Sequence, residues 1–113
     1  MYRPTLLIDL DGVLNQYGKE KYDKDNIPQI KKGAKEFIEE LYKLNQYDLV
    51  LFTTRNTLLA SKWLIKNKLD IYFKDITNVK IPAYLHIDDR AICFQGDYKQ
   101  TFAEIENFKT WWK

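Results

Sequence analysis

The chain alternates short apolar runs with longer segments in which apolar residues recur every three or four positions. Short continuous apolar runs predict buried strands, and the longer spacing predicts amphipathic helices. Strands are expected at 5–10, 48–53, 70–73, 83–87 and 91–94. Helices are expected over about 30–44 and 58–65, the second with Asn56 or Thr57 as its N-cap, and from Tyr98 onward behind Asp97.

This alternation predicts an α/β protein with a three-layer, Rossmann-like fold, in which helices cover both faces of a mainly parallel sheet. A length of 113 residues is enough for one domain, residues 1–113, with a single core. The last helix is expected to complete that core with an apolar stripe. Trp111 and Trp112 are expected to finish it, with one of the two partly exposed and available for contact between two copies. The stripe comprises Tyr98, Phe102, Ile105, Phe108 and Trp112.

Composition narrows the class of protein. The net charge is only +2, and lysines and acids are interspersed, so nothing indicates nucleic-acid binding. One cysteine, Cys93, cannot form an internal disulfide and is expected to be a small buried residue. No stretch approaches the roughly 18 apolar residues of a membrane span, and acids interrupt the N-terminal apolar run, so no signal peptide is indicated. We therefore expect a cytoplasmic protein without a membrane or nucleic-acid partner.

Two carboxylates stand where the first apolar strand ends, in the sequence Asp9-Leu10-Asp11-Gly12. Unpaired charges are costly in a buried strand, so Asp9 and Asp11 are expected at its open end, where they can share a cation. Gly12 allows a sharp turn and a close approach of the backbone to a ligand. The polar segment 15–28 follows directly and is interpreted as a flap over this site.

Polar residues also follow the other predicted strands: Thr53, Thr54 and Arg55 after the second, and Asp88 and Asp89 after the fourth. In parallel sheets, ligands bind beyond the carboxyl ends of the strands. Several acids at one edge require a cation, and oxygen ligands favour Mg²⁺. A threonine hydroxyl and a lysine would suit phosphate oxygens. The candidate lysine is Lys80, with Lys74 as the alternative.

Four motifs in order along the chain resemble those of the haloacid dehalogenase superfamily of aspartate-nucleophile phosphatases. They are the Asp9-Leu10-Asp11-Gly12-Val13 segment, the strand ending in Thr53, Lys80 in Val79-Lys80-Ile81-Pro82, and the acidic pair in His86-Ile87-Asp88-Asp89-Arg90. The intervals between them are too short for the inserted cap domain of larger relatives. The chain is therefore similar to a capless member of that superfamily.

The resemblance implies a role for each matched residue. Asp9 would attack phosphorus and bind Mg²⁺, while Asp11 would act as general acid and base and bind the metal through its backbone carbonyl. Thr53 and Lys80 would hold the phosphoryl group. In the acidic pair, Asp89 is preferred as the metal ligand and Asp88 as a residue that orients Lys80 or a metal-bound water, and exchange of these two roles stays open.

These observations predict a magnesium-dependent phosphomonoester hydrolase that forms an aspartyl-phosphate intermediate. Its substrate is a phosphorylated molecule of unidentified class: a nucleotide, a sugar phosphate or something larger. The alternative is a non-catalytic or receiver-like signalling module that binds a phosphorylated ligand. Arg55 would contact the substrate or form a salt bridge at a helix start. Tyr17, Lys19, Lys21 and Tyr22 would contact the substrate or remain solvated.

Overall fold

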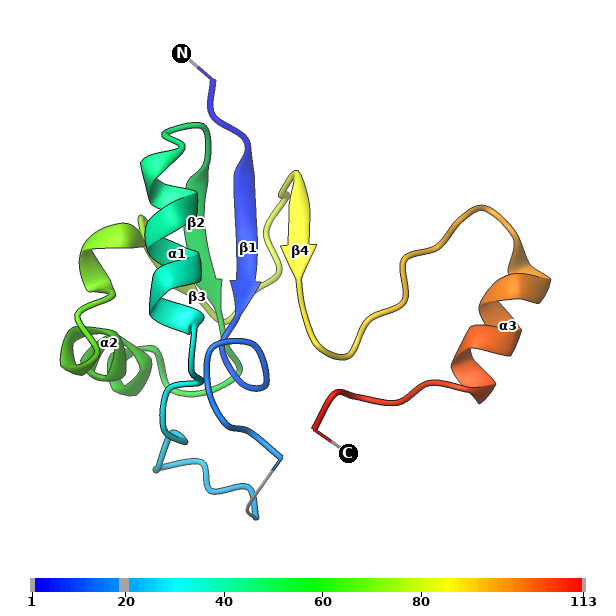
Figure 1. The fold of residues 1–113 in the computed structure, drawn as a ribbon, viewed down its shortest axis with the longest axis horizontal. Coiled ribbons are helices and arrows are strands. Elements are labelled where there is room, and N and C mark those ends of the chain that lie inside the picture. Colours follow the sequence, from blue (N-terminus) through cyan, green and yellow to red (C-terminus); the bar gives the residue numbers. More distant parts are fainter. Residues whose placement is uncertain (1, 19–20, 113) are drawn as a thin grey trace.

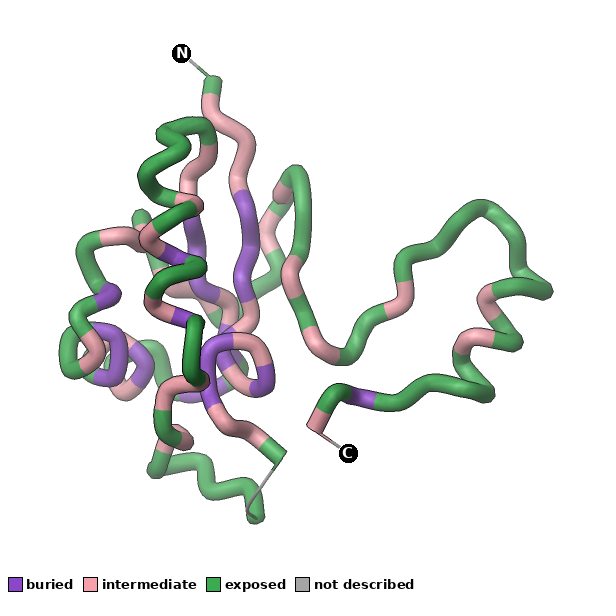
Figure 2. The backbone as a smooth tube through the Cα atoms, in the orientation of Figure 1, coloured by how far each residue is buried: buried purple, intermediate pink, exposed green. Residues whose placement is uncertain are grey.

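Four parallel strands form the centre of the protein in the computed structural model, which describes residues 2–18 and 21–112. The strand order across the sheet is β3-β2-β1-β4 (Figure 1). Within the sheet, the buried positions all lie in the two central strands, because a strand with a neighbour on each side is shielded from water (Figure 2). The strands are β1 (Thr5–Asp9), β2 (Asp48–Phe52), β3 (Asp75–Thr77) and β4 (Leu85–Ile87).

Two helices connect the first three strands, as the apolar spacing predicts. Helix α1 (Ala34–Lys43) joins β1 to β2, and α2 (Thr57–Lys66) joins β2 to β3. Asn56 is the N-cap of α2, because its side-chain oxygen accepts from the backbone N–H groups of Leu58 and Leu59 at 2.9 and 3.1 Å. No helix within residues 2–18 and 21–112 has the length and apolar character needed to cross a membrane.

The core lies between these two helices and one face of the sheet. Leu6 and Ile8 of β1 stand beside Leu49 and Leu51 of β2 in the parallel register, so all four side chains point to the same face. Buried apolar residues of α1 and α2 pack against them, namely Ala34, Ile38, Ala60, Trp63 and Leu64. The predicted α/β fold with a parallel sheet and no inserted cap domain is confirmed for the described residues. Both core helices pack on the same face of the sheet, however, so they do not form the helical layer expected on the second face.

Two of the predicted strands are wrong. Residues 70–73 contain a short 3₁₀ helix, η1 (Asp70–Tyr72), and the third strand begins only at Asp75. Ile71 is exposed in η1. The Tyr72 hydroxyl donates to the Glu39 carboxylate of α1 at 2.9 Å, so this segment is hydrogen-bonded to a helix and not to a neighbouring strand. Residues 91–94 form no strand, and Cys93 is exposed rather than buried.

Helix α3 (Tyr98–Glu106) forms where the sequence predicts it, capped by the Asp97 carboxylate. Its expected packing into the core is wrong: Tyr98, Phe102 and Ile105 are exposed, and the helix stands apart from the sheet, beyond β4 (Figure 1). Apolar spacing defines the stripe of a helix but does not identify its partner. After α3 the chain turns back toward the carboxyl ends of the strands, and Thr110 is buried there.

Candidate active site

Three carboxylates converge at the carboxyl ends of β1 and β4. Asp9 is the last residue of β1, and Asp88 and Asp89 directly follow β4. Because these neighbouring strands are parallel and Ile8 pairs with Ile87, both ends open at the same edge of the sheet. One oxygen from each of the three carboxylates lies within 4.8 Å of the others. Such a set of hard oxygen donors suits a divalent cation such as Mg²⁺.

Burial and repulsion between the carboxylates raise pKa values in this cluster. Burial, together with the negative charges of Asp88, Asp89 and Asp11, raises the pKa of the Asp9 carboxyl to about 7. The pKa of Asp89 is also raised, mainly by burial. A bound cation favours the ionised form of both groups, so the electrostatics of the cluster fit a metal.

Gly12 makes room for the Asp89 carboxylate. Its φ of +83° is a conformation that suits glycine, and a Cβ at this position would overlap the Asp89 carboxyl group. One Asp89 oxygen, Oδ2, accepts from the indole Nε1 of Trp112 at 2.6 Å. The other, Oδ1, is buried and has no hydrogen-bond partner among the described residues. It is therefore the Asp89 oxygen that remains available to a cation.

The Asp11 carboxylate is not part of the three-carboxylate cluster, although it lines the same pocket. Its carboxylate accepts three hydrogen bonds from Arg55, including Nε to Oδ2 at 2.9 Å, and one from Asn15 at 3.1 Å. The Arg55 side chain is almost wholly buried and also donates to the backbone oxygen of Asp23 at 2.6 Å. Of the two roles open to Arg55, the structure therefore shows the salt bridge.

The segment after β2 is held by its neighbours. Thr53 is buried, and its hydroxyl accepts from the backbone N–H of Arg55 at 3.0 Å. Asn78, just after β3, donates from its side-chain amide to the backbone oxygens of Thr53 and Arg55, at 2.5 and 2.8 Å. Thr54 is exposed and lines the pocket beside the carboxylates. Thr54 is thus the threonine of this segment that faces the cavity.

The predicted lysine does not line the carboxylate pocket. Lys80 is exposed in the connection between β3 and β4, and the described cavity walls do not include it. Its alternative, Lys74, forms an ion pair with Asp48 at 3.3 Å, at the opposite end of β2. Arg90 is the cationic side chain that lines this pocket, next to the acidic pair. It is the better placed group for an anion.

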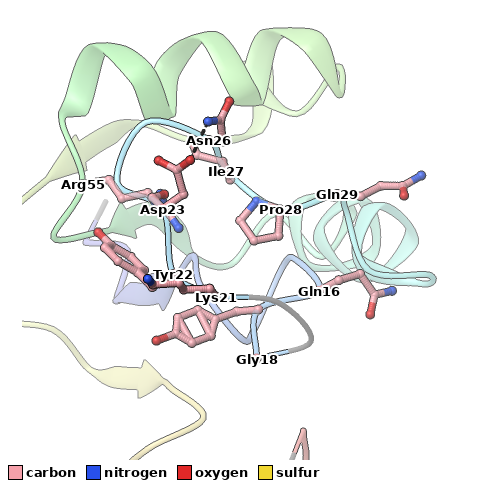
Figure 3. A pocket seen from close by; sticks show the side chains of 11 residues that line it. Gln16, Gly18, Lys21, Tyr22, Asp23, Asn26, Ile27, Pro28, Gln29 and Arg55 are labelled. Atoms are coloured by element: carbon pink, nitrogen blue, oxygen red, sulfur yellow. Dashed lines mark hydrogen bonds between the residues drawn. The ribbon is translucent and has the colours of Figure 1, made fainter.

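Two adjoining cavities make up the site. The first, about 430 Å³, contains Asp9, Asp11 and Asp88 in its wall. The second, about 680 Å³, is lined mainly by residues of the flap segment, including Lys21, and by Arg55 (Figure 3). Tyr17 and Tyr22 line both cavities. The predicted flap therefore borders the carboxylates, and Lys19 lies outside the described residues.

Three residues of the site are absent from the sequence-based set of candidates. Asn15 is fully buried; it donates to the Asp11 carboxylate and accepts from the backbone N–H of Gly12, whereas the sequence pattern indicates only the start of the flap. The signal for Arg90 was its position next to Asp88-Asp89. Trp112 reaches the site from the far end of the chain, and no local pattern indicates that contact.

Comparison of the chain with protein-family models, curated proteins and solved structures gives no match. The assignment of a function therefore depends on the residues of the site and on their geometry.

Proposed function

We propose that the protein is a magnesium-dependent phosphomonoester hydrolase of the haloacid dehalogenase type, with Asp9 as its nucleophile. The observation that supports this most directly is the convergence of Asp9, Asp88 and Asp89 at the ends of two adjacent parallel strands. Crowded, partly buried carboxylates are costly without a counter-charge. Mg²⁺ binds such oxygens and commonly shares its remaining positions with water and a substrate phosphate.

In this proposal Asp9, Asp88 and Asp89 hold the cation, with the Asp11 backbone carbonyl as a further ligand. The cation supplies positive charge next to the phosphoryl oxygens. Asp9 attacks phosphorus, the bond from phosphorus to the leaving oxygen breaks, and an aspartyl phosphate results. Thr54 and Arg90 are the pocket groups best placed to bind the phosphoryl oxygens. Water then cleaves the aspartyl phosphate and restores Asp9.

Asp11 would give a proton to the leaving oxygen and then accept one from the attacking water. It lines the same pocket as Asp9, so it is close to the reacting phosphate. Both of its carboxylate oxygens are engaged by Arg55 in this structure. Proton transfer requires Asp11 to give up at least one of these contacts, so Arg55 would control when Asp11 is available.

The same ion pair favours a second candidate function. If Arg55 keeps Asp11 engaged throughout, the site lacks a free acid and base and would bind a phosphorylated ligand without hydrolysing it. Lys80, the lysine that would complete the phosphate site, is also outside the pocket wall. The two candidate functions differ in one measurable property, which is turnover of a phosphate ester.

The test is hydrolysis of an aryl phosphate by the purified full chain, with Mg²⁺ or with excess chelator. If the protein is a hydrolase, turnover should require Mg²⁺ and should be abolished in Asp9→Asn. In Asp11→Asn, turnover should fall about 10²- to 10⁴-fold. Asp70→Asn is the matched control, because Asp70 is an exposed acid remote from the cluster, and it should behave as the wild type. Full turnover in chelator would contradict the proposal, and saturable phosphate binding without turnover would favour the binding module.

A further inference from the structure

The chain returns to the candidate active site after α3, in the segment Thr110–Trp112 (Figure 1). Both tryptophans of this C-terminal segment donate a hydrogen bond to the site. Trp111 Nε1 donates to the backbone oxygen of Gly12 at 2.6 Å, and Trp112 Nε1 donates to Asp89 Oδ2 at 2.6 Å. These contacts join the end of the chain to the turn after β1 and to the acidic pair after β4.

The Trp112 ring is held from more than one side. It packs against the Tyr17 ring, with 5.3 Å between centroids and a 48° angle between planes. It also lies against Gly18, where a Cβ would overlap the indole. Contacts with the flap thus fix the orientation of the Trp112 ring, and because the indole N–H lies in the plane of that ring, they also fix the direction in which it donates. A rigid donor of this kind can determine the orientation of the carboxylate that accepts from it.

The Trp111 ring has different contacts. It is about half exposed, and the Lys31 ammonium lies 4.4 Å from the ring centroid. Its N–H group bonds to a backbone carbonyl and not to a carboxylate. Trp111 therefore anchors the C-terminal segment through the Gly12 carbonyl, and its indole N–H does not bond to any of the three clustered acids.

We propose that Trp112 is a positioning residue of the metal centre, which holds Asp89 Oδ2 so that Oδ1 is presented to the cation. This inference rests on the proposed function, because it assumes that the carboxylate cluster binds a metal. Asp89 Oδ1 is buried without a hydrogen-bond partner among the described residues, which is the state expected of a carboxylate fixed through its other oxygen. A tryptophan that only completed the core would need no polar contact with an acid of this cluster.

Binding of Mg²⁺ alone to the purified full chain tests this, measured by calorimetry. Trp112→Phe keeps an aromatic ring beside Tyr17 but removes the donor to Asp89, and we expect Mg²⁺ affinity to fall about tenfold or more. Trp111→Phe is the matched control, because it also removes one indole N–H bond of the same segment. We expect its affinity to stay within about twofold of the wild type.

A second readout follows the tryptophans themselves. Mg²⁺ should change the fluorescence of the wild type, and Trp112→Phe should lose that change although Trp63 and Trp111 remain. Adding Trp112→Phe to Asp89→Asn should weaken Mg²⁺ binding no further, because the carboxylate that Trp112 orients is gone. Circular dichroism confirms that each variant is folded, and Trp112→Tyr replaces Trp112→Phe if the latter is not.

Equal affinities of Trp112→Phe and the wild type would overturn the inference and leave the hydrolase intact. An equal loss in Trp111→Phe and Trp112→Phe would also overturn it, because docking of the whole segment would then be what matters. No saturable Mg²⁺ binding by the wild type would instead refute the metal centre on which the proposed function depends.

Discussion

Arg55 and Asp11 form a buried ion pair, with 2.9 Å between Nε and Oδ2. Their side chains are only 1% and 12% exposed. The pair links the segment after β2 to the turn after β1, so it fixes two walls of the site relative to each other. It also engages the Asp11 carboxylate, so the clustered carboxylates that could hold a cation are those of Asp9, Asp88 and Asp89.

Replacing Arg55 should destabilise the protein, because it leaves the Asp11 carboxylate buried without its partner. We expect Arg55→Leu to lower the free energy of unfolding by about 3 kcal/mol, measured by urea denaturation. Lys74→Met is the matched control, since the Lys74 side chain is 69% exposed in its ion pair with Asp48. That change should cost less than about 1 kcal/mol. Equal losses in the two variants would contradict the buried ion pair.

Gly12→Ala should harm both stability and metal binding. Gly12 and Gly96 have similar positive φ values, +83° and +88°, but a Cβ overlaps Asp89 only at Gly12. Each alanine should cost about 1 kcal/mol of backbone strain, so Gly96→Ala serves as the control. We expect Gly12→Ala to cost more in urea denaturation and also to weaken Mg²⁺ binding in calorimetry. Unchanged Mg²⁺ affinity in Gly12→Ala would show that Asp89 has room to move.

The raised pKa of Asp9 predicts a pH dependence of stability without metal. The folded-state pKa of about 7 lies above the ordinary value of 3.8, so protonated Asp9 is the form that folding favours. The contribution of Asp9 to the free energy of unfolding is fully present below about pH 4 and is lost as the pH rises through 7. In the presence of chelator, the unfolding free energy of Asp9→Asn should therefore rise relative to that of the wild type as the pH increases. The increase in this difference from pH 4 to pH 8 should be about 1–2 kcal/mol, after allowance for screening.

The check is urea denaturation of both proteins at several pH values. A difference in unfolding free energy that stays constant with pH would contradict the raised pKa. Saturating Mg²⁺ should reduce the difference at pH 8, because a cation that binds only the folded wild type adds to its stability.

The flap should influence which substrates are accepted. Tyr22 lines both cavities, and the Arg55 guanidinium lies 4.8 Å from its ring centroid. We expect Tyr22→Ala to change the ratio of kcat/KM between a small and a bulky phosphate ester severalfold, with Mg²⁺ affinity unchanged. Tyr84→Ala, at an exposed position outside both cavity walls, should leave the ratio unchanged. The prediction fails if both variants keep the wild-type ratio.

Much of the fold could be predicted from the sequence, because strong local patterns determine it. The apolar runs of β1 and β2 and the N-caps Asn56 and Asp97 place elements within a residue or two of where they form. The 70–73 run was too short for its apolar content to distinguish a strand from a turn of helix. Apolar spacing predicts α3 but not its packing partner, since spacing within a helix carries no information about what lies opposite.

The site was only partly predictable, for a similar reason. Asp9, Asp88 and Asp89 could be found because parallel strands bring their carboxyl ends to one edge. The engagement of Asp11 by Arg55, and of Asp89 by Trp112, depends on side chains 44 and 23 residues apart. Contacts of this kind follow from tertiary packing, and a linear motif does not encode them.

The central claim, that Asp9 is the nucleophile, is tested most directly by transfer of labelled phosphate to the protein. The full chain is mixed with a labelled phosphate ester and Mg²⁺ and quenched in acid within a turnover, and the label is located by peptide mass spectrometry. The account predicts label on the peptide that carries Asp9, sensitive to hydroxylamine as acyl phosphates are, retained in Asp70→Asn and absent in Asp9→Asn. Turnover with no label on the protein, or label that persists in Asp9→Asn, would contradict it.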